Sequence, residues 1–367
     1  MRLTLPNLAI LIASLALLDP SAAVAQSAND QIAAEISRLK QSLETKPITD
    51  SGLAPVASSA SQNLAEASAA LESGKLYLSL EKLLLAEDLL SAARFPAENL
   101  TTAGSGYAAF EAEWKTVNRT VSARNRESLE RDWSRSPAVI RALTETAVAR
   151  CLPLLDGGRG FAASTKPEDG LLYVGQAQGE AAFASFASSL VVKREGAPFP
   201  LRSFLPELQT LQRKTSEAFR PPRSVELHQR FIALNSALKL AQELDAQKSY
   251  AGALYQYLEA TRHFAMLDAP PVEPARQERL KAEISGMQRK LSSLASDSSL
   301  AALFLERAAS QIDHPDGSAP SPDEWRSAQV ILASVVPAYL AAQRPAAALP
   351  STGAKTVQLT LVRWPYT

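Results

Sequence analysis

The sequence predicts an all-α protein, an irregular helical-hairpin bundle or superhelix of about ten helices. Apolar residues after Gln26 recur almost everywhere at spacings of three and four, as on one side of a helix. Helix-start signals, a capping serine followed by a proline, occur at Ser136 and Ser321. Only KTVQLTLVRWPYT at the C-terminus alternates apolar and polar residues, which predicts a single β-strand-like tail.

The first 25 residues have the pattern of a secretory signal peptide. Arg2 precedes an apolar run from Leu8 to Leu18, and the small residues Ala23 and Ala25 mark a cleavage site. The run covers about half of the roughly 20 residues that a membrane-spanning helix needs. We therefore expect cleavage after Ala25 and export to the periplasm or the exterior of a bacterial cell, with no membrane span afterwards.

The mature chain divides into three parts at changes of composition. An N-terminal helical region covers 26–200, a C-terminal helical region covers 201–350, and an extended tail covers 351–367. The boundary between the helical regions falls in REGAPFPLRSFLP at 194–206, which is the most linker-like segment in the middle of the chain.

Three helices are expected before residue 100. Ile32, Ile36 and Leu39 lie at spacings of four and three and define the apolar side of the first helix. The second helix, at about 57–72, is mostly alanine and serine. The third, KLYLSLEKLLLAEDLLSAARF from residue 75, carries leucines around most of its circumference, which predicts a central position in the bundle.

Two further helices are expected before the glycine cluster DGGRG at 156–160. The first is long and charged, from 107 to 133, with a break near Asn118, and the second begins after Ser136. No lysine-serine pair follows the glycine cluster, so it does not match a phosphate-binding loop and predicts a flexible turn between helices.

The helix expected at 171–190 carries a row of small residues. Gly175, Gly179 and Ala182 recur at spacings of four and three. This row predicts unusually close packing against a neighbouring helix.

The C-terminal region also has helical periodicity. After a short helix between 206 and 220, the expected helices are a long pair from 224 to about 264, then 274–296, 298–312 and one that starts at Ser321.

The segment from 237 to 260 resembles a tetratricopeptide repeat, a two-helix module in which large and small residues alternate so that antiparallel helices nest. The residues that carry the resemblance are Leu240, Ala241, Leu244, Tyr250, Ala253, Tyr257 and Ala260. Tyr250 and Tyr257 should therefore pack against the preceding helix, with the alanines leaving room for it. Tyr255 and Arg262 fall on the opposite side of the helix and form a possible partner-contact surface.

A second hairpin of this kind is indicated near the N-terminus. Shifting the sequence by 173 residues places Leu71, Lys75, Tyr77 and Leu85 on Leu244, Lys248, Tyr250 and Leu258. Leu80 and Glu87 depart from the pattern, because they stand where it has small residues.

The composition and motifs disfavour several functions. The chain has 38 cationic and 38 anionic residues, so it has no global field to attract nucleic acid. None of the three histidines lies at metal-ligand spacing from another, and no G-x-S-x-G nucleophile motif is present. We therefore assign no catalytic, cofactor-binding or metal-binding residues and expect no cofactor.

Three functions remain open. The first is a secreted or periplasmic, non-enzymatic helical scaffold that binds a protein or peptide of the cell envelope. The second is an enzyme acting on envelope polymers with one of the abundant glutamates as acid or base. The third is a binder of an apolar small molecule between the leucine-rich third helix and the helix at 171–190.

Overall fold

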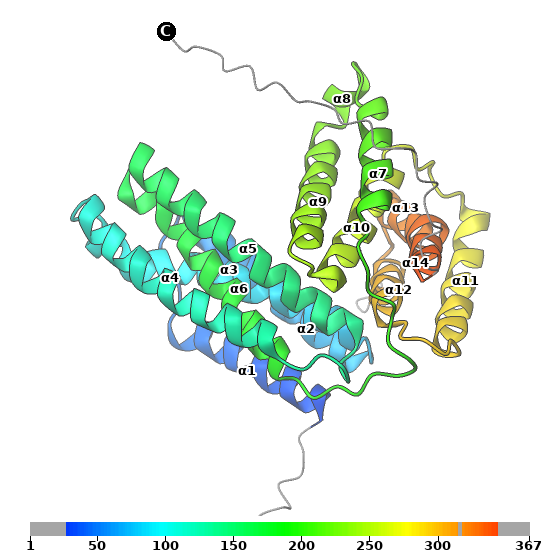
Figure 1. Cartoon of the computed structure of the whole chain (residues 1–367), viewed down its shortest axis with the longest axis horizontal. Coiled ribbons are helices and arrows are strands. Elements are labelled where there is room, and N and C mark those ends of the chain that lie inside the picture. Colours follow the sequence, from blue (N-terminus) through cyan, green and yellow to red (C-terminus); the bar gives the residue numbers. More distant parts are fainter. Residues whose placement is uncertain (1–26, 315–317, 344–367) are drawn as a thin grey trace, which may run out of the picture.

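The computed structural model describes residues 27–314 and 318–343 (Figure 1). Every helix or strand element in these ranges is a helix, which confirms the predicted all-α class. The predicted signal peptide and the predicted strand-like tail at 351–367 lie outside the described residues. None of the described helices combines the length and the apolar character needed to cross a membrane.

Six helices and a short 3₁₀ turn form what we call the first half. They are α1 (Ala28–Thr45), α2 (Ala54–Glu72), α3 (Leu76–Ala103), α4 (Tyr107–Glu130), α5 (Ala138–Ser164), η1 (Pro167–Gly170) and α6 (Leu171–Ser189). Figure 1 shows α1–α6 lying side by side as an elongated bundle.

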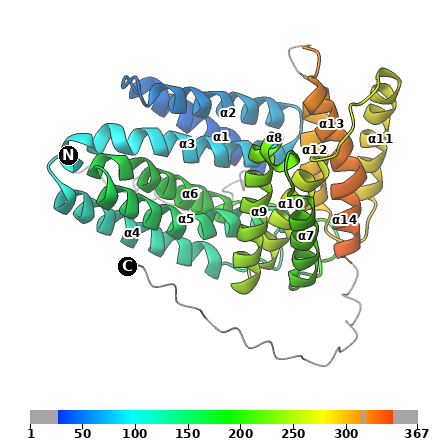
Figure 2. The same ribbon diagram turned by 90° about the horizontal axis from the view of Figure 1, so that it is seen from above.

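The remaining helices form the second half. They are α7 (Leu205–Ala218), α8 (Arg223–Glu226), α9 (His228–Ala246), α10 (Tyr250–Ala265), α11 (Pro274–Ser292), α12 (Ser299–Ile312), α13 (Pro322–Val330), the π-helical segment η2 (Ile331–Val335) and α14 (Val336–Ala342). The last three are continuous and amount to one long helix. Figures 1 and 2 show the second half against one end of the first, with α7, α9 and α11 steeply inclined to the first-half helices.

The leucine-rich helix α3 is central in the first half, as predicted. It packs along α2 on one side and along α6 on another. The contact with α6 is close because of the small-residue row: a Cβ on Gly175 would lie 2.4 Å from the backbone oxygen of Ser91, and one on Gly179 would lie 2.6 Å from that of Glu87. The predicted close packing is therefore confirmed at these two glycines.

Two sequence-based predictions for α4 and α5 are wrong. α4 continues through Asn118 without a break, and α5 continues through the glycine cluster at 156–160 to Ser164. One of these glycines serves packing instead of turning, since a Cβ on Gly158 would lie 2.8 Å from the backbone oxygen of Gly170. The cost of glycine in a helix is offset here by a close approach of chain segments.

Both halves contain an antiparallel helix pair closed by the same three-residue turn. α2 and α3 form one pair, α9 and α10 the other, and each turn has one residue in the left-handed region, Gly74 (φ 71°) and Lys248 (φ 63°). In each turn one N–H bonds three residues back and the next N–H five residues back, as in a Schellman motif. These bonds are Gly74 to Leu71 (3.0 Å), Lys75 to Ala70 (2.8 Å), Lys248 to Asp245 (3.0 Å) and Ser249 to Leu244 (2.9 Å).

The turn geometry corrects the register between the two hairpins. Shifting by 173 residues matched Lys75 with Lys248, but Lys248 occupies the left-handed position of Gly74, so equivalent residues differ by 174. Matching identical residues gave the wrong register, because it aligned Lys75 with Lys248. The residues that share the left-handed backbone conformation are Gly74 and Lys248.

Each hairpin is capped by a carboxylate of the other half, and Glu145 is buried while Glu306 is half-buried. The N–H of Leu78, third residue of α3, donates to Glu306 Oε2 on α12 (2.8 Å). The N–H of Gly252, third residue of α10, donates to Glu145 Oε2 on α5 (2.8 Å). A carboxylate at this place satisfies N–H groups that have no partner within the helix and interacts favourably with the helix dipole.

The starts of α5 and α12 also meet at one side chain. Asp297 accepts from the N–H of Ala138 at the start of α5 (2.7 Å) and from the N–H of Ser299 at the start of α12 (2.9 Å). Glu145 and Glu306 are each the eighth residue of their helix. The contacts between the halves are thus reciprocal, as in an interface with approximate two-fold symmetry.

Candidate functional site

A groove of about 950 Å³ lies at the seam between the two halves. Its lining comes from α2 and α3 on the first-half side, α10, α12 and α13 on the second-half side, and α5. The volume is within the range of small-molecule and peptide sites. The groove therefore brings together helices that are far apart in sequence.

An ion-pair network crosses the seam at this groove. Arg307 of α12 bonds both carboxylate oxygens of Glu81 on α3, and it donates to Glu259 Oε1 on α10 (2.6 Å). The Tyr255 hydroxyl donates to Glu81 Oε1 (2.6 Å), and Arg262 donates to Glu259 Oε2 (3.0 Å). These charges are paired with one another, which is the condition under which buried charges are tolerated.

The network fixes the protonation of its members. Burial opposes ionisation of Glu259, but the attraction of Arg307 and Arg262 outweighs it and lowers the pKa of Glu259 to about 2. Burial and the neighbouring Glu81 hold the pKa of Tyr255 well above its usual value. Glu259 is therefore a permanently ionised partner for arginine, and this role does not suit a proton donor.

The second arginine of the groove is Arg150, which lies beside two buried carboxylates. Arg150 on α5 has Nη1 at 2.6 Å from Glu180 Oε1 and Nη2 at 3.8 Å from Asp88 Oδ2. The Glu180 contact is close in distance but lacks hydrogen-bond geometry. Burial raises the pKa of Glu180 to about 8 and that of Asp88 to about 6, against the attraction of Arg150.

Two neutral groups of the groove are buried without a hydrogen-bond partner. They are the hydroxyl of Thr146 on α5, in a residue 3% exposed, and the side-chain oxygen Oε1 of Gln311 on α12. Leaving such a group unpaired costs about 1–3 kcal/mol. Both residues line the groove, but the two atoms are themselves covered, so each side chain must rotate before a bound molecule can supply the missing hydrogen bond.

The arginines and the unpaired groups occupy equivalent positions in the two halves. With Glu145 matched to Glu306, Thr146 on α5 corresponds to Arg307 on α12, because each follows its capping glutamate directly. By the same offset Arg150 corresponds to Gln311. Each of the two helices therefore contributes one arginine and one neutral hydrogen-bonding group to the groove, in opposite order.

The structure places both predicted partner-contact residues, Tyr255 and Arg262, in the groove lining. Tyr255 is 7% exposed and is therefore a buried member of this lining. The reason is that α10 packs on α9 by one face and on α5 by another, which buries both sides of the helix. Arg262 is half-buried and paired with Glu259.

The seven hairpin residues lie in the α9–α10 pair. Ala241, Leu244, Ala253 and Ala260 are fully buried, while Leu240, Tyr250 and Tyr257 are half-buried and packed against the core. The α9–α10 segment is therefore a packed helix pair.

Four charged residues of the site were not predicted from the sequence: Glu81, Arg150, Glu180 and Arg307. The available signal was local: each is a charged residue inside a strongly apolar helical stretch, such as ALFLERAAS around Arg307. Charged residues are seldom fully buried unless they are paired. A search for such isolated charges would have found the candidates but not their partners.

Within the described part of the chain, no group of three or more His, Cys, Asp or Glu side chains is arranged to hold a metal ion. Cys151 is a free, buried thiol whose pKa burial raises to about 12. No protein-family model matches the chain, and no similar protein was found among curated proteins or solved structures.

Proposed function

We propose that the protein is an exported helical scaffold that binds an extended polar segment of a cell-envelope protein or peptide in the seam groove. The observation that carries the proposal is the pair of buried, unpaired hydrogen-bonding groups, Thr146 and Gln311, beside arginines and carboxylates that already neutralise one another. A peptide backbone offers neutral N–H and C=O groups at regular intervals. Such groups suit this lining better than a net charge or a hydrocarbon chain does.

The resemblance of the α9–α10 hairpin to a tetratricopeptide unit supports the same proposal, since α10 contributes Tyr255, Glu259 and Arg262 to the groove. Helical-hairpin proteins commonly use faces of this kind to hold extended partners. The carboxylates Glu81 and Glu259 are both bonded to Arg307, which favours a binding role over acid-base chemistry.

The test compares two threonines of α5. Thr146 is unpaired and lines the groove, whereas the hydroxyl of Thr144, also buried, donates to Ile140 O of its own helix (2.9 Å). Peptides selected for binding from a random-sequence display library serve as probes, with affinity measured by fluorescence anisotropy. Thr146→Val should weaken binding about five-fold, the value of one hydrogen bond, and Thr144→Val should leave affinity unchanged.

The same variants give a second readout without any ligand. Thr146→Val removes an unsatisfied hydroxyl and should raise the free energy of unfolding by about 1 kcal/mol, while Thr144→Val should lower it. If no displayed peptide binds, or if the bound peptides do not distinguish the two variants, the groove is not the binding site and the proposal is wrong.

A further inference from the structure

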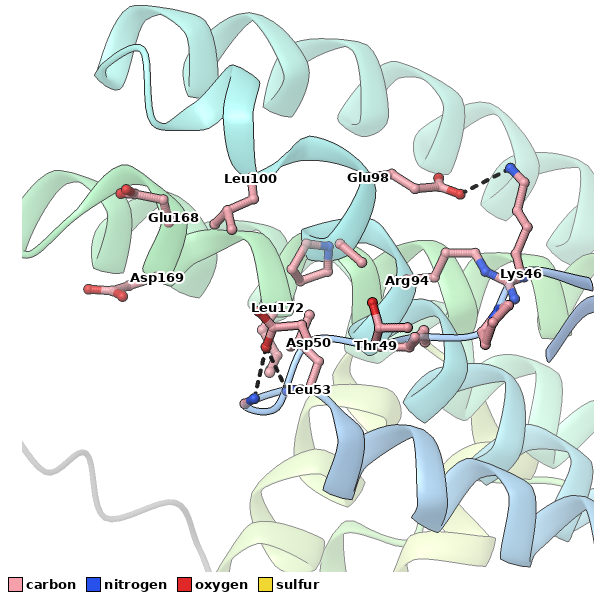
Figure 3. A pocket seen from close by; sticks show the side chains of 15 residues that line it. Lys46, Thr49, Asp50, Leu53, Arg94, Glu98, Leu100, Glu168, Asp169 and Leu172 are labelled. Atoms are coloured by element: carbon pink, nitrogen blue, oxygen red, sulfur yellow. Dashed lines mark hydrogen bonds and ion pairs between the residues drawn. The ribbon is translucent and has the colours of Figure 1, made fainter. Parts of the chain in front are cut away.

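A second pocket, of about 690 Å³, lies in the first half, away from the seam. It is formed by the α1–α2 loop, the C-terminal part of α3 and the start of α6 (Figure 3). Figure 3 shows Lys46, Arg94 and Glu98 on one side of it and Glu168 and Asp169 on the opposite side. The pocket is therefore polar at two ends.

Apolar side chains line the stretch between these ends. Leu53, Leu100 and Leu172 lie there in Figure 3, and Pro96 of α3 belongs to the same wall. Leu100 is 47% exposed, an unusually large exposure for a leucine on a pocket wall. Covering this surface with a hydrocarbon group would remove it from water, which stabilises a complex by about 25 cal/mol per Å².

Arg94 is the unusual member of the cationic end. Its guanidinium is half-buried and donates to the backbone oxygen (2.9 Å) and hydroxyl (2.5 Å) of Ser42. In the part of the chain that the structure describes, no carboxylate lies within ion-pair distance of it, whereas Arg150, Arg262 and Arg307 all have carboxylate partners. Glu87 lies within electrostatic range of Arg94 but makes no direct contact with it. A partly desolvated guanidinium with no carboxylate in direct contact is a site for an anionic group.

The pocket also has acidic side chains, and none of them forms an ion pair with Arg94. Glu98 faces Lys46 (3.5 Å), and Asp50 accepts from the backbone N–H of Gly52 (2.8 Å). Glu168 and Asp169 lie at the far side from Arg94 (Figure 3). Their charges would repel an acid group, so an amphipathic anion entering the pocket is oriented with its acid group toward Arg94.

We propose that this pocket binds a small amphipathic organic acid, with its carboxylate on Arg94 and its hydrocarbon part on Leu53, Pro96 and Leu100. The two ends of the pocket give the direction of binding, and the apolar stretch between them gives the affinity. The site is independent of the seam groove, which shares none of its lining residues.

The experiment measures binding of octanoate to the full chain at neutral pH by calorimetry, with octylammonium as a probe of the same chain length and opposite charge. Octanoate should bind, and Arg94→Gln should weaken it at least ten-fold, while Arg94→Lys retains part of the affinity. The control is Arg159→Gln, because Arg159 is exposed, paired with Glu111 and outside the pocket.

Arg94 also bonds Ser42 near the end of α1, so its replacement affects a contact between helices. A second variant is therefore needed to separate a loss of binding from a loss of folding. Leu100→Ser changes an exposed side chain and should weaken octanoate binding several-fold with an unchanged melting temperature. The proposal is overturned if octanoate does not bind, if octylammonium binds more tightly than octanoate, or if folded Arg94→Gln binds octanoate as well as the unaltered protein does.

Discussion

The two halves of the molecule are built alike where they touch and differ in what they contribute to the groove. Both have a helix pair closed by a Schellman turn. Glu145 of the first half caps α10 of the second half, and Glu306 of the second half caps α3 of the first half. At the next position, however, α5 has Thr146 and α12 has Arg307. The shared features are those that hold the halves together, and the differences lie in the side chains that line the groove.

This comparison indicates that the seam is a structural unit in its own right. Carboxylates at helix starts are costly to bury unless they are satisfied. Glu306 accepts from the first half, and Glu145 is bonded both to Gly252 of the second half and to Arg141 of its own helix. Neither half would retain these caps alone. We therefore expect the two halves to unfold together, although each has its own bundle of helices.

The largest effect is expected at Asp297, whose side chain caps one helix of each half. Asp297→Ala removes the acceptor for the first N–H groups of α5 and α12 together, and it should lower the free energy of unfolding by about 3 kcal/mol. Urea denaturation followed by circular dichroism measures this loss. Asp50→Ala is the control, because Asp50 is exposed and caps only the entry to α2, which is worth about 1 kcal/mol. Equal losses in the two variants would contradict a shared cap.

The reciprocal caps should cost less than Asp297 but reveal more about cooperativity. Glu145→Ala and Glu306→Ala each leave buried N–H groups unpaired and should cost about 2 kcal/mol. In calorimetry each variant should shift a single unfolding transition of the whole chain. Two separate transitions, with only one of them moved, would show that the halves unfold independently. Glu306→Gln is the conservative control, because burial raises the pKa of Glu306 to about 7 and an amide resembles its protonated form.

The helices were predictable from sequence and the seam was not, for a physical reason. Periodicity and capping are local, so helix starts near Ser136-Pro137 and Ser321-Pro322 could be predicted directly. The Ser321–Glu324 capping box is present, but the predicted Ser136 cap is wrong, because the N-cap of α5 is Pro137 and has no side-chain hydrogen bond. The glycine cluster at 156–160 was misread because the segment that Gly158 packs against, at Gly170, belongs to another element.

The residues of the groove were harder to predict from the sequence than the helices. Arg307 meets Glu81 across 226 residues of sequence, and no local pattern records that contact. The offset between the hairpins could be detected, but the correct register needed the left-handed turn at Lys248, which a lysine does not indicate. The sequence thus predicted the helix pairs, and tertiary packing decided which of their side chains form a site.

Two buried carboxylates, Glu180 and Glu259, should differ in their pH dependence. Burial raises the pKa of Glu180 to about 8, so above its ordinary pKa this group is protonated in the folded state and ionised in the unfolded state. Its contribution to stability is therefore greatest at low pH and is lost as pH rises from about 5 to 8. Arg150 and Asp88 face Glu180 and share this titration.

Urea denaturation at pH 5 and pH 8 measures the effect. Glu180→Gln should reduce the decline between them, while Glu87 and Glu306, whose pKa values burial raises to about 7, still contribute to it. The carboxylate Glu259 has a pKa lowered to about 2, so its contribution is instead lost as pH falls below about 4.5. A profile that still declines from pH 5 to 8 in Glu180→Gln to the same extent would assign the effect to other groups.

The smallest effect is expected at the two turns, which differ by one residue in the same conformation. Lys248 adopts φ 63° where Gly74 adopts φ 71°, and a side chain in this region costs about 1 kcal/mol relative to glycine. Lys248→Gly should therefore stabilise the protein by about 1 kcal/mol, and Gly74→Ala should destabilise it by a similar amount. A Cβ at Gly74 meets no atom within 4 Å, so the cost there is conformational and not steric. Chemical denaturation of both variants measures the two changes, and they should be opposite in sign and similar in size. Changes of the same sign would show that the two turns are not equivalent, and the 174-residue correspondence between the halves would then fail at the place where it was established.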